Sequence, residues 1–364
     1  MKKLFALLLA LAMVLSLAAC GASEAPATEA PATEAPATEA PAADAPATEA
    51  APAGPEYTEV TLKFGTSSAE SSLTAKAFME WGRLLSEASD GKVNVEVYCS
   101  SVLGNNTEMI QGAQMGTIDV VVIQPAGLYD MGADKMILLN LPYLFENYDM
   151  YYNTLFSDIG DELLQNVTDK IQGLVGFSYL PDGGRCYFTA GEGNDIRSLE
   201  DIKGMKLRVQ SYAIDSSTAT ALGFSATPTA ISELYSALDT GVVDGAEQPL
   251  SAIDGNAFYE VSDYITLDNH TYNLPTLVMS EKTWGKLNAE TQQLLKDKWE
   301  ETVDGYFCPQ LADYEAGLLA KFQEYGCEII ELADHDAWVE AVDPVWAEYG
   351  AGLEDLIAKV QANG

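Results

Sequence analysis

The chain has 364 residues, of which 19 are basic and 55 acidic, and its net charge at pH 7 is −36. This excess of negative charge argues against a nucleic-acid partner, because phosphate backbones are bound by basic surfaces. The length suits two lobes of ordinary domain size once the N-terminal segments are set aside.

Residues 1–20 have the features of a signal peptide. Lys2 and Lys3 precede a run of about 14 mostly apolar residues, which is too short to cross a membrane. The run ends in Leu-Ala-Ala-Cys20-Gly, which resembles the bacterial lipobox, in which the cysteine becomes the lipid-modified first residue. We therefore expect an extracytoplasmic protein anchored by lipid at Cys20 to the outer face of the cell membrane, or in the periplasm. The alternative is an ordinary cleavage site with a chance cysteine.

Residues 21–56 form a low-complexity tract in which the unit Ala-Pro-Ala-Thr-Glu recurs. The tract has almost no large apolar side chains to bury, so burial cannot offset the entropy of ordering it. Proline and mutually repelling carboxylates favour extended conformations. We expect a disordered linker that holds the folded part away from a membrane, a composition that a glycosylated stalk would also show.

The folded part begins with alternating strand and helix patterns. Strands are predicted at 60–65, 93–98 and 120–123, and helices at 73–88 and 107–115. The order strand, helix, strand, helix, strand is typical of a largely parallel sheet with helices on its faces.

The pattern recurs in the second half, with a strand at 206–209 and helices at 213–222 and 232–239. In both halves a helix ends in Gly-x-x-Asp before a strand, at Gly116 to Asp119 and at Gly241 to Asp244. This repetition predicts two similar α/β lobes.

The remaining segments are predicted to connect and cover these lobes. The apolar run 274–279 is expected to return as a strand to the first lobe, and 289–325 to form a long helix with a possible kink at Phe307-Cys308, near Pro309. Residues 336–362 are predicted to be helical again.

Residues that could carry catalysis or bind metal are sparse. The four cysteines after Cys20 show no zinc-site spacing; Cys308 with Cys327 and Cys99 with Cys186 are possible pairs, and free thiols are the alternative. The two histidines are too few for a metal site or a triad, and we expect them at the surface or in hinge packing. P-loop, HExxH, GxSxG and EF-hand motifs are absent from the sequence. We therefore expect no enzyme activity, catalytic residue, cofactor or metal.

Arg208 stands at the end of the predicted strand 206–209 in a chain with only four arginines. A cation placed there in so acidic a protein suggests a bound anion. The structural alternative is an ion pair with Asp201 or Asp244.

Several motifs around Arg208 carry a resemblance to a known family. They are Gly183-Gly184-Arg185, Lys206-Leu207-Arg208-Val209, Leu222-Gly223, Thr227-Pro228, Glu233-Leu234-Tyr235-Ser236-Ala237-Leu238 and Gly241-Val242-Val243-Asp244-Gly245-Ala246-Glu247-Gln248-Pro249, with Ser280-Glu281-Lys282-Thr283-Trp284 further on. The chain from 57 to 364 resembles the solute-binding proteins of tripartite ATP-independent periplasmic (TRAP) transporters, the DctP family, in a lipoprotein form.

The resemblance implies a two-lobed α/β fold of the periplasmic-binding-protein kind, type II-like, with hinge strands and a long helix spanning both lobes. Lobe I would comprise 57–182 plus 274–313, and lobe II 183–273 plus 314–364. Hinge crossings are expected near 180–183, near Tyr272 and in the long helix around 306–314.

The resemblance also implies a binding site. The arginine matching Arg208 pairs with the ligand carboxylate in the family, and one matching Arg185 lies nearby in many members. Gln248 replaces the usual asparagine, and Ile231 stands where an aromatic ring often packs on the ligand, which puts that stacking contact in doubt.

Four further ligand contacts are predicted from their places after strands or at a crossover: Ser67, Ser68, Gln124 and Asn273. Three of them have a structural alternative, namely helix capping for the two serines and hinge packing for Asn273.

Together these features predict an extracytoplasmic receptor that closes on a small organic acid carrying a carboxylate and delivers it to TRAP membrane subunits. One alternative is a sensor of the same fold that docks on a signalling receptor; a less favoured one is an extracellular hydrolase. The sequence leaves the ligand's identity, the oligomeric state, the disulfide pairing and the choice between transporter and sensor open.

Overall fold

The computed structural model describes residues 55–332 and 334–363. The predicted signal peptide, Cys20 and nearly all of the predicted linker lie outside the described residues. Within the described ranges, no helix has both the length and the apolar character needed to cross a membrane.

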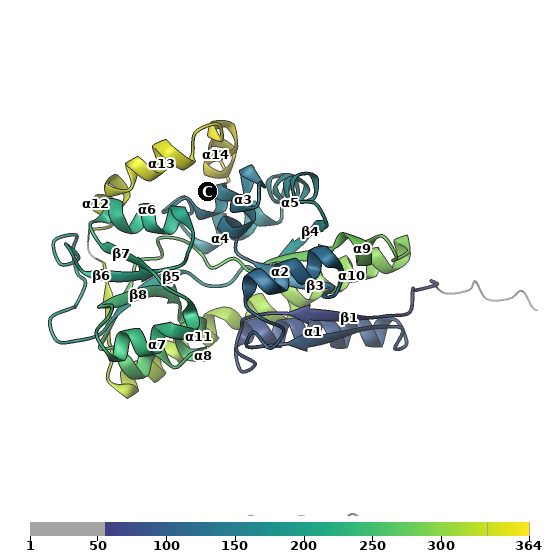
Figure 1. Cartoon of the computed structure of the whole chain (residues 1–364), viewed down its shortest axis with the longest axis horizontal. Helices are drawn as coiled ribbons and strands as arrows, with labels where there is room; N and C mark the ends of the chain where they lie inside the picture. The colour runs from purple at the N-terminus through teal and green to yellow at the C-terminus, as the bar shows by residue number, and fades with distance from the viewer. Residues whose placement is uncertain (1–54, 333, 364) are drawn as a thin grey trace, which may run out of the picture. The chain divides into compact units, whose positions relative to one another are not determined.

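The first of two sheets has the strand order β2-β1-β3-β10-β4 (Figure 1). Its strands are β1 (Val60–Gly65), β2 (Val93–Tyr98), β3 (Val120–Ile123), β4 (Leu174–Tyr179) and β10 (Thr276–Ser280). β1 runs parallel to β2 and β3, as predicted, whereas β10 is antiparallel to both β3 and β4. The sheet is therefore mixed, because β10 enters it from the other sheet and runs against its neighbours.

The second sheet has the order β11-β9-β5-β8-β6-β7. Its strands are β5 (Arg185–Thr189), β6 (Lys206–Val209), β7 (Ser225–Pro228), β8 (Gly245–Pro249), β9 (Tyr264–Leu267) and β11 (Glu328–Glu331). The order β7-β6-β8-β5 matches β2-β1-β3-β10, and in both sets the last strand is the antiparallel one. The prediction of two similar α/β lobes is confirmed by this shared order.

The two Gly-x-x-Asp turns have the same structural role. Gly116 and Gly241 adopt left-handed backbone angles, with φ of 77° and 69°, which glycine reaches without strain. In each turn the aspartate side chain accepts a hydrogen bond from a lysine backbone N–H in the adjacent strand, Asp119 from Lys63 and Asp244 from Lys206, both at 2.8 Å. Each turn thus fixes the register of its parallel strand pair.

The predicted helices flank these sheets with bounds close to those expected. They are α1 (Leu73–Ala88), α2 (Asn106–Met115), α6 (Ala213–Leu222) and α7 (Ile231–Asp239). α2 begins one residue before the predicted start, because Asn105 and Glu108 form a reciprocal capping box. Shorter segments complete the layers: α3 (Pro125–Asp130), η1 (Asp134–Asn140), α4 (Tyr148–Leu155), α5 (Asp158–Lys170), α8 (Leu250–Gly255), η2 (Phe258–Val261) and α9 (Glu281–Trp284).

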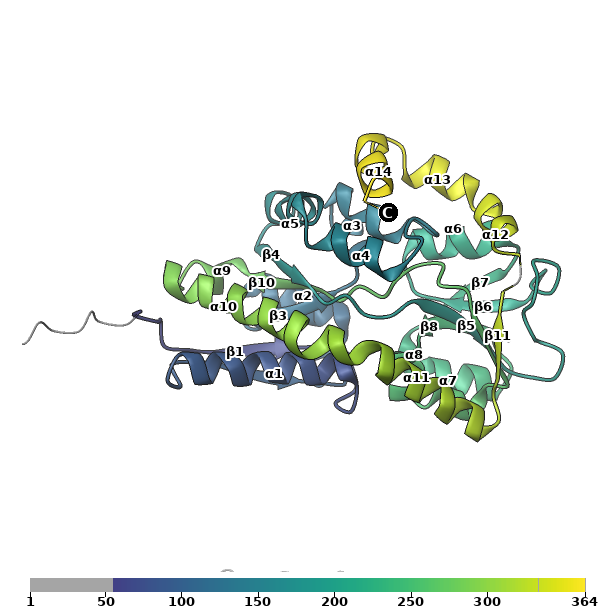
Figure 2. The same ribbon diagram turned by 180° about the vertical axis from the view of Figure 1, so that it is seen from behind.

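Three chain segments connect the two sheets. The stretch from β4 to β5 and the stretch from β9 to β10 lie side by side, with a bridge between Gly184 and Tyr272. The third connection is the long helix, which consists of α10 (Ala289–Thr302), a π-helical turn (Val303–Phe307) and α11 (Cys308–Tyr325) and passes along both sheets in Figure 2. The π-helical turn ends directly before Cys308, next to the place where a kink was predicted, and such turns are often found at functional positions.

The C-terminal helices contact elements of both sheets. They are α12 (His335–Ala341), α13 (Asp343–Tyr349) and α14 (Glu354–Gln361). α13 packs on α6, which flanks the second sheet, whereas α14 packs on α5, which flanks the first. In α12 the side chain of Trp338 is fully buried. The residue bounds of the two lobes stay a prediction.

The four cysteines among the described residues are free thiols, so neither considered disulfide forms. Cys186 and Cys327 are buried, whereas Cys99 and Cys308 are half-buried. Among the described residues there is also no group of three or more histidine, cysteine or acidic side chains suited to holding a metal ion.

Candidate functional site: a cavity between the two sheets

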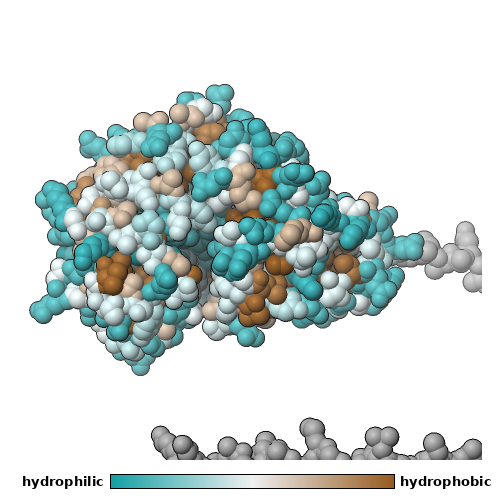
Figure 3. Space-filling model, viewed as in Figure 1, coloured by the Kyte–Doolittle hydropathy of each residue, from teal (hydrophilic) through white to brown (hydrophobic). Residues whose placement is uncertain are grey.

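A cavity of about 530 Å³ lies where strands of both sheets end. Its walls include residues that follow β1 and β3 of the first sheet and β6 of the second. Crevices outside the carboxyl ends of such strands are the usual ligand positions in α/β folds. The surface in Figure 3 is hydrophilic over most of its area and is hollowed between the halves that carry the two sheets.

All eight ligand-binding residues predicted from the sequence line this one cavity: Ser67, Ser68, Gln124, Arg185, Arg208, Ile231, Gln248 and Asn273. They come from segments that are far apart in the chain. Their contact with a ligand stays a prediction.

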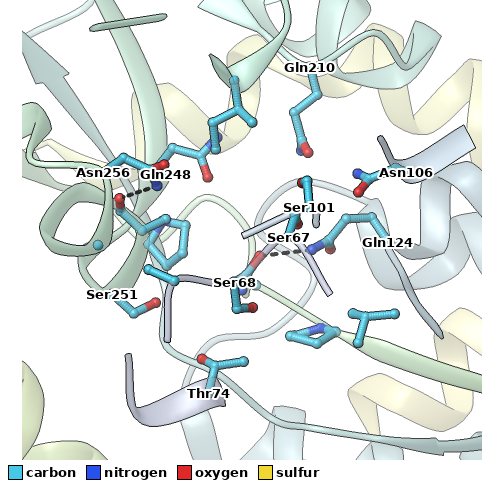
Figure 4. Close-up of a pocket in the computed structure, with 18 of the residues that line it drawn as sticks. Ser67, Ser68, Thr74, Ser101, Asn106, Gln124, Gln210, Gln248, Ser251 and Asn256 are labelled. Atoms are coloured by element: carbon cyan, nitrogen blue, oxygen red, sulfur yellow. Dashed lines mark hydrogen bonds between the residues drawn. The ribbon is translucent and has the colours of Figure 1, made fainter. Parts of the chain in front are cut away.

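The wall from the first sheet presents hydroxyl and amide groups. Ser67 and Ser68 follow β1, and the Ser68 backbone N–H donates to the Thr66 hydroxyl at 3.1 Å, which turns the loop toward the cavity. Gln124 occupies the N-cap position of α3, yet its side chain caps nothing and instead donates to Asn273 Oδ1 at 3.1 Å (Figure 4). The helix-capping alternative for Ser67 and Ser68 is wrong, because Ser72 caps α1.

The wall from the second sheet holds Gln248 in β8 and Ile231 at the start of α7. Gln248 is buried, and Ile231 is 36% exposed. Among the described lining residues Tyr212 is the single aromatic one. The cavity therefore offers hydrogen-bonding groups rather than a stacking platform.

Arg208 is a buried cation that forms no ion pair with any acidic side chain in the part of the chain that the structure describes. Its side chain is 3% exposed, its Nε donates to the Thr229 carbonyl oxygen at 2.9 Å, and its Nη1 has no partner within the described part of the chain. The predicted structural alternatives are wrong, because Asp201 accepts from the turn at Arg197 and Ser198, and Asp244 accepts from Lys206.

The surroundings of Arg208 disfavour its charge. Burial lowers the pKa of Arg208, since Glu247 and Asp215 attract the guanidinium too weakly to offset the lost hydration. Burial together with the Glu247 carboxylate raises the pKa of Asp215 to about 7, so Asp215 supplies only part of a negative charge at neutral pH. A buried charge without a partner is costly, and an anion in the cavity would remove that cost.

Arg185, in contrast, has protein partners for all three guanidinium nitrogens. Nε pairs with Glu247 Oε2 at 2.5 Å, Nη2 donates to the Glu247 carbonyl oxygen at 3.2 Å, and Nη1 donates to Asn273 Oδ1 at 3.2 Å. Burial opposes ionisation of Glu247, but Arg185 and His270 outweigh it and lower the pKa of Glu247 to about 2. The charge of Arg185 is therefore already balanced within the protein.

His270 joins this cluster as a second cation. Its Nδ1 lies 2.8 Å from Asp268 Oδ2 and its Nε2 lies 3.5 Å from Glu247 Oε2. Burial disfavours its charged form, but the two carboxylates outweigh burial and raise the pKa of His270 to about 9. The expectation of a surface or hinge-packing histidine missed this role, because its partner Glu247 is brought to it only by the folding of the second sheet.

The cavity also contains residues that the sequence analysis did not single out, above all Asp182. The Oδ2 atom of Asp182 accepts hydrogen bonds from Asn273 at 2.9 Å, from Ser251 at 3.1 Å and from Thr74 at 3.3 Å. These three partners lie 69 to 108 residues away in the sequence, so a local sequence pattern does not predict the contacts of Asp182. The neighbouring Gly183 is so closely packed that an added Cβ would overlap the Glu315 carboxylate.

The chain is similar to known proteins over most of its length. Residues 64–352 match the sequence profile of the bacterial extracellular solute-binding proteins, family 7, DctP. A solute-binding protein of Roseobacter denitrificans is 30% identical over 301 residues, which cover 83% of this chain and 85% of the relative. The C4-dicarboxylate-binding periplasmic protein DctP of Rhodobacter capsulatus is 27% identical over 306 residues, with 83% and 90% covered.

Solved structures show the same similarity. A TRAP periplasmic solute-binding protein from Pseudomonas putida F1 with bound D-glucuronate is 29% identical, has a TM-score of 0.78, and is matched over 97% of its length by 83% of this chain. One from Xanthobacter autotrophicus with bound β-D-galacturonate is 27% identical, has a TM-score of 0.77, and is matched over 99% of its length by 83% of this chain.

Proposed function

Because the chain belongs to family 7 of the bacterial extracellular solute-binding proteins, the DctP family, we propose that it captures a small organic anion through its carboxylate and delivers it to the membrane subunits of a TRAP transporter. The observation that carries the proposal is the unpaired guanidinium of Arg208 in the cavity wall. A guanidinium presents a rigid fork of donors that matches a carboxylate.

The interaction would be strong in this position. A charge pair gains strength where water is excluded, and Arg208 is already buried before a ligand arrives. A ligand carboxylate would engage the free Nη1 and supply the missing negative charge. Gln124, Gln248, Asn273, Ser67 and Ser68 would then bind the rest of the ligand, and Ile231 would cover it.

The ligands of the solved relatives support a carboxylate as the shared feature. D-glucuronate and β-D-galacturonate each carry one carboxylate and several hydroxyls. The family and these neighbours are transport proteins, and we propose that this chain likewise binds its ligand without converting it.

Capture would proceed by hinge closure between lobe I (57–182 plus 274–313) and lobe II (183–273 plus 314–364). The two strand connections and the π-helical turn at Val303–Phe307 are the segments that would bend. A lipid at Cys20 and the predicted linker would hold the receptor at the outer face of the membrane, near its transport partners.

The test begins with a thermal-shift screen of organic acids on the secreted protein, followed by calorimetry and small-angle scattering with the best ligand. We expect one-to-one binding of a carboxylate compound and a smaller radius of gyration in the complex. Binding of uncharged compounds alone, or the appearance of a reaction product, would contradict the proposal.

Delivery is tested separately in cells. Deletion of the gene should abolish uptake of the bound acid, and the wild-type gene, but not Arg208→Ala, should restore it. Unchanged uptake together with an altered transcriptional response to the acid would favour the sensor instead.

A further inference from the structure

The cavity wall carries a second unpaired charge, opposite in sign to Arg208. Asp182 lies between β4 and β5, its side chain is 2% exposed, and it lines the cavity. No lysine, arginine or histidine within 55–332 and 334–363 forms an ion pair with it. The only other charged lining residue among those described, Arg185, is neutralised by Glu247.

The contacts of Asp182 are those of an ionised carboxylate. Besides the three bonds to Oδ2, its Oδ1 accepts from the Gly183 backbone N–H at 2.9 Å. The Gly183 backbone N–H and the Asn273 side-chain amide can only donate, so each carboxylate oxygen of Asp182 accepts at least one hydrogen bond, which suits the ionised form. Burial raises the pKa of Asp182, and these four hydrogen bonds oppose that shift.

The donors around Asp182 come from both halves of the molecule. Two of its partners, Thr74 from α1 and Ser251 from α8, lie at one end of the view in Figure 4, and Gln210 and Asn106 lie at the other. Ser67, Ser68, Ser101 and Gln124 lie toward the middle of the view and Gln248 lies at its left, and all five present amide or hydroxyl groups in the cavity wall. The wall thus combines one free positive charge, one negative charge and many neutral polar groups.

We propose that Asp182 is a specificity-determining residue that restricts the cavity to acids with a single carboxylate whose other polar groups are hydroxyls, and that excludes dicarboxylates. The inference rests on the proposed function, since Arg208 must hold the one carboxylate.

The reason is the charge balance of the closed cavity. One ligand carboxylate balances Arg208, and a second would be buried beside Asp182 without a cation to compensate it, because Arg185 already pairs with Glu247. Hydroxyls both donate and accept, so they can satisfy the serine and amide groups without adding charge. Repulsion of the wrong ligand is a recognised source of specificity.

The first test compares matched ligands on the secreted wild-type protein by calorimetry at fixed ionic strength. The pairs differ in one end group: D-gluconate with D-glucarate, D-galactonate with galactarate, and D-erythronate with meso-tartrate, alongside succinate and malate. The tightest ligand should be a hydroxylated monocarboxylate, bound about tenfold or more tighter than its dicarboxylate partner. A dicarboxylate as the tightest ligand, or no binding of any hydroxylated monocarboxylate, would overturn the proposal.

The second test removes the charge while keeping the shape of the side chain. In Asp182→Asn the preference for the monocarboxylate should shrink by about tenfold, because the ratio of affinities reports the repulsion directly. The matched control is Asp254→Asn, which makes the same substitution at an aspartate of α8 that does not line the cavity and pairs with Lys321, and it should keep the wild-type ratio.

An Asp182→Asn protein that keeps the wild-type ratio would overturn the proposal, and if this variant does not fold, the comparison of matched ligands on the wild type decides alone. Failure of the proposed function looks different: no carboxylate binds at all, or Arg208→Ala binds as tightly as the wild type.

Discussion

Two arginines lie in the same cavity wall and differ in their counter-ions. Arg185 is at the start of β5, and its guanidinium binds both the carboxylate and the backbone carbonyl oxygen of Glu247. Arg208 is at the end of β6, and its guanidinium binds only the Thr229 carbonyl oxygen among the described residues. Both are almost completely buried.

The difference shows that a buried arginine can either stabilise the protein around a site or bind a ligand there. A buried arginine whose charge is matched by the protein contributes to the order of the fold. A buried arginine whose charge is unmatched makes the empty cavity unfavourable and favours any state in which an anion fills it. The comparison predicts opposite effects of the same substitution at the two positions.

The largest expected effect is on the paired arginine. Arg185→Ala leaves Glu247 buried without its guanidinium partner, and we expect the free energy of unfolding to fall by about 3–5 kcal/mol. Urea denaturation followed by circular dichroism measures this. A variant that keeps wild-type stability but loses ligand binding would reverse the roles assigned to the two arginines.

Arg208→Ala should instead act on binding. The ligand carboxylate loses its buried partner, so affinity should fall by about 2–5 kcal/mol, measured by calorimetry. The stability of the empty protein should hold or rise, because an uncompensated buried charge has been removed. Wild-type affinity in this variant would reject the role of Arg208.

The buried cluster of Arg185, Glu247, Asp268 and His270 should also make the stability of the protein depend on pH in the alkaline range. The pKa of His270 is raised from 6.5 to about 9 in the fold, so its contribution to stability is complete below pH 6.5 and is lost as the pH rises through 9. The loss should be roughly 3 kcal/mol.

Urea denaturation of the wild type and of His270→Asn at pH 6 and pH 10 isolates this contribution. The wild type should lose more stability between the two values than the variant does. Equal losses in both proteins would show that His270 is not charged in the fold.

The smallest expected effect comes from Arg208→Lys, which keeps the charge but not the planar fork. One charge-assisted hydrogen bond to the ligand should be lost, which weakens binding by about 1.5–3 kcal/mol. Calorimetry with the same ligand as for Arg208→Ala gives the comparison. Full recovery of affinity would mean that charge alone, and not the geometry of the guanidinium, holds the carboxylate.

Much of the fold was predictable from local signals. The strands β1, β2, β3 and β6 and the helix α1 have the predicted bounds, because alternation, helical spacing and turn residues mark them within a few positions of the chain. The antiparallel direction of β10 was not predictable, since it depends on where the chain returns after crossing to the other sheet.

The candidate site was predictable in part. The family motifs single out residues that the structure brings to one cavity. The sequence did not single out Asp182, because the residues that bind its side chain are distant in the chain. Thr74, Ser251 and Asn273 come from α1, α8 and a crossover, and only the fold brings them to Asp182.

The amino-acid sequence alone determined that the folded part contains two repeated α/β units and that arginines stand at Arg185 and Arg208. Only the tertiary structure decided which of the two arginines forms an ion pair with the protein and which is left to bind a ligand. Glu247 is 62 residues from Arg185, and the antiparallel pairing of β5 with β8 brings the two together. Ion pairing depends on distances between atoms across strands, and those distances are set by register and packing rather than by spacing along the chain.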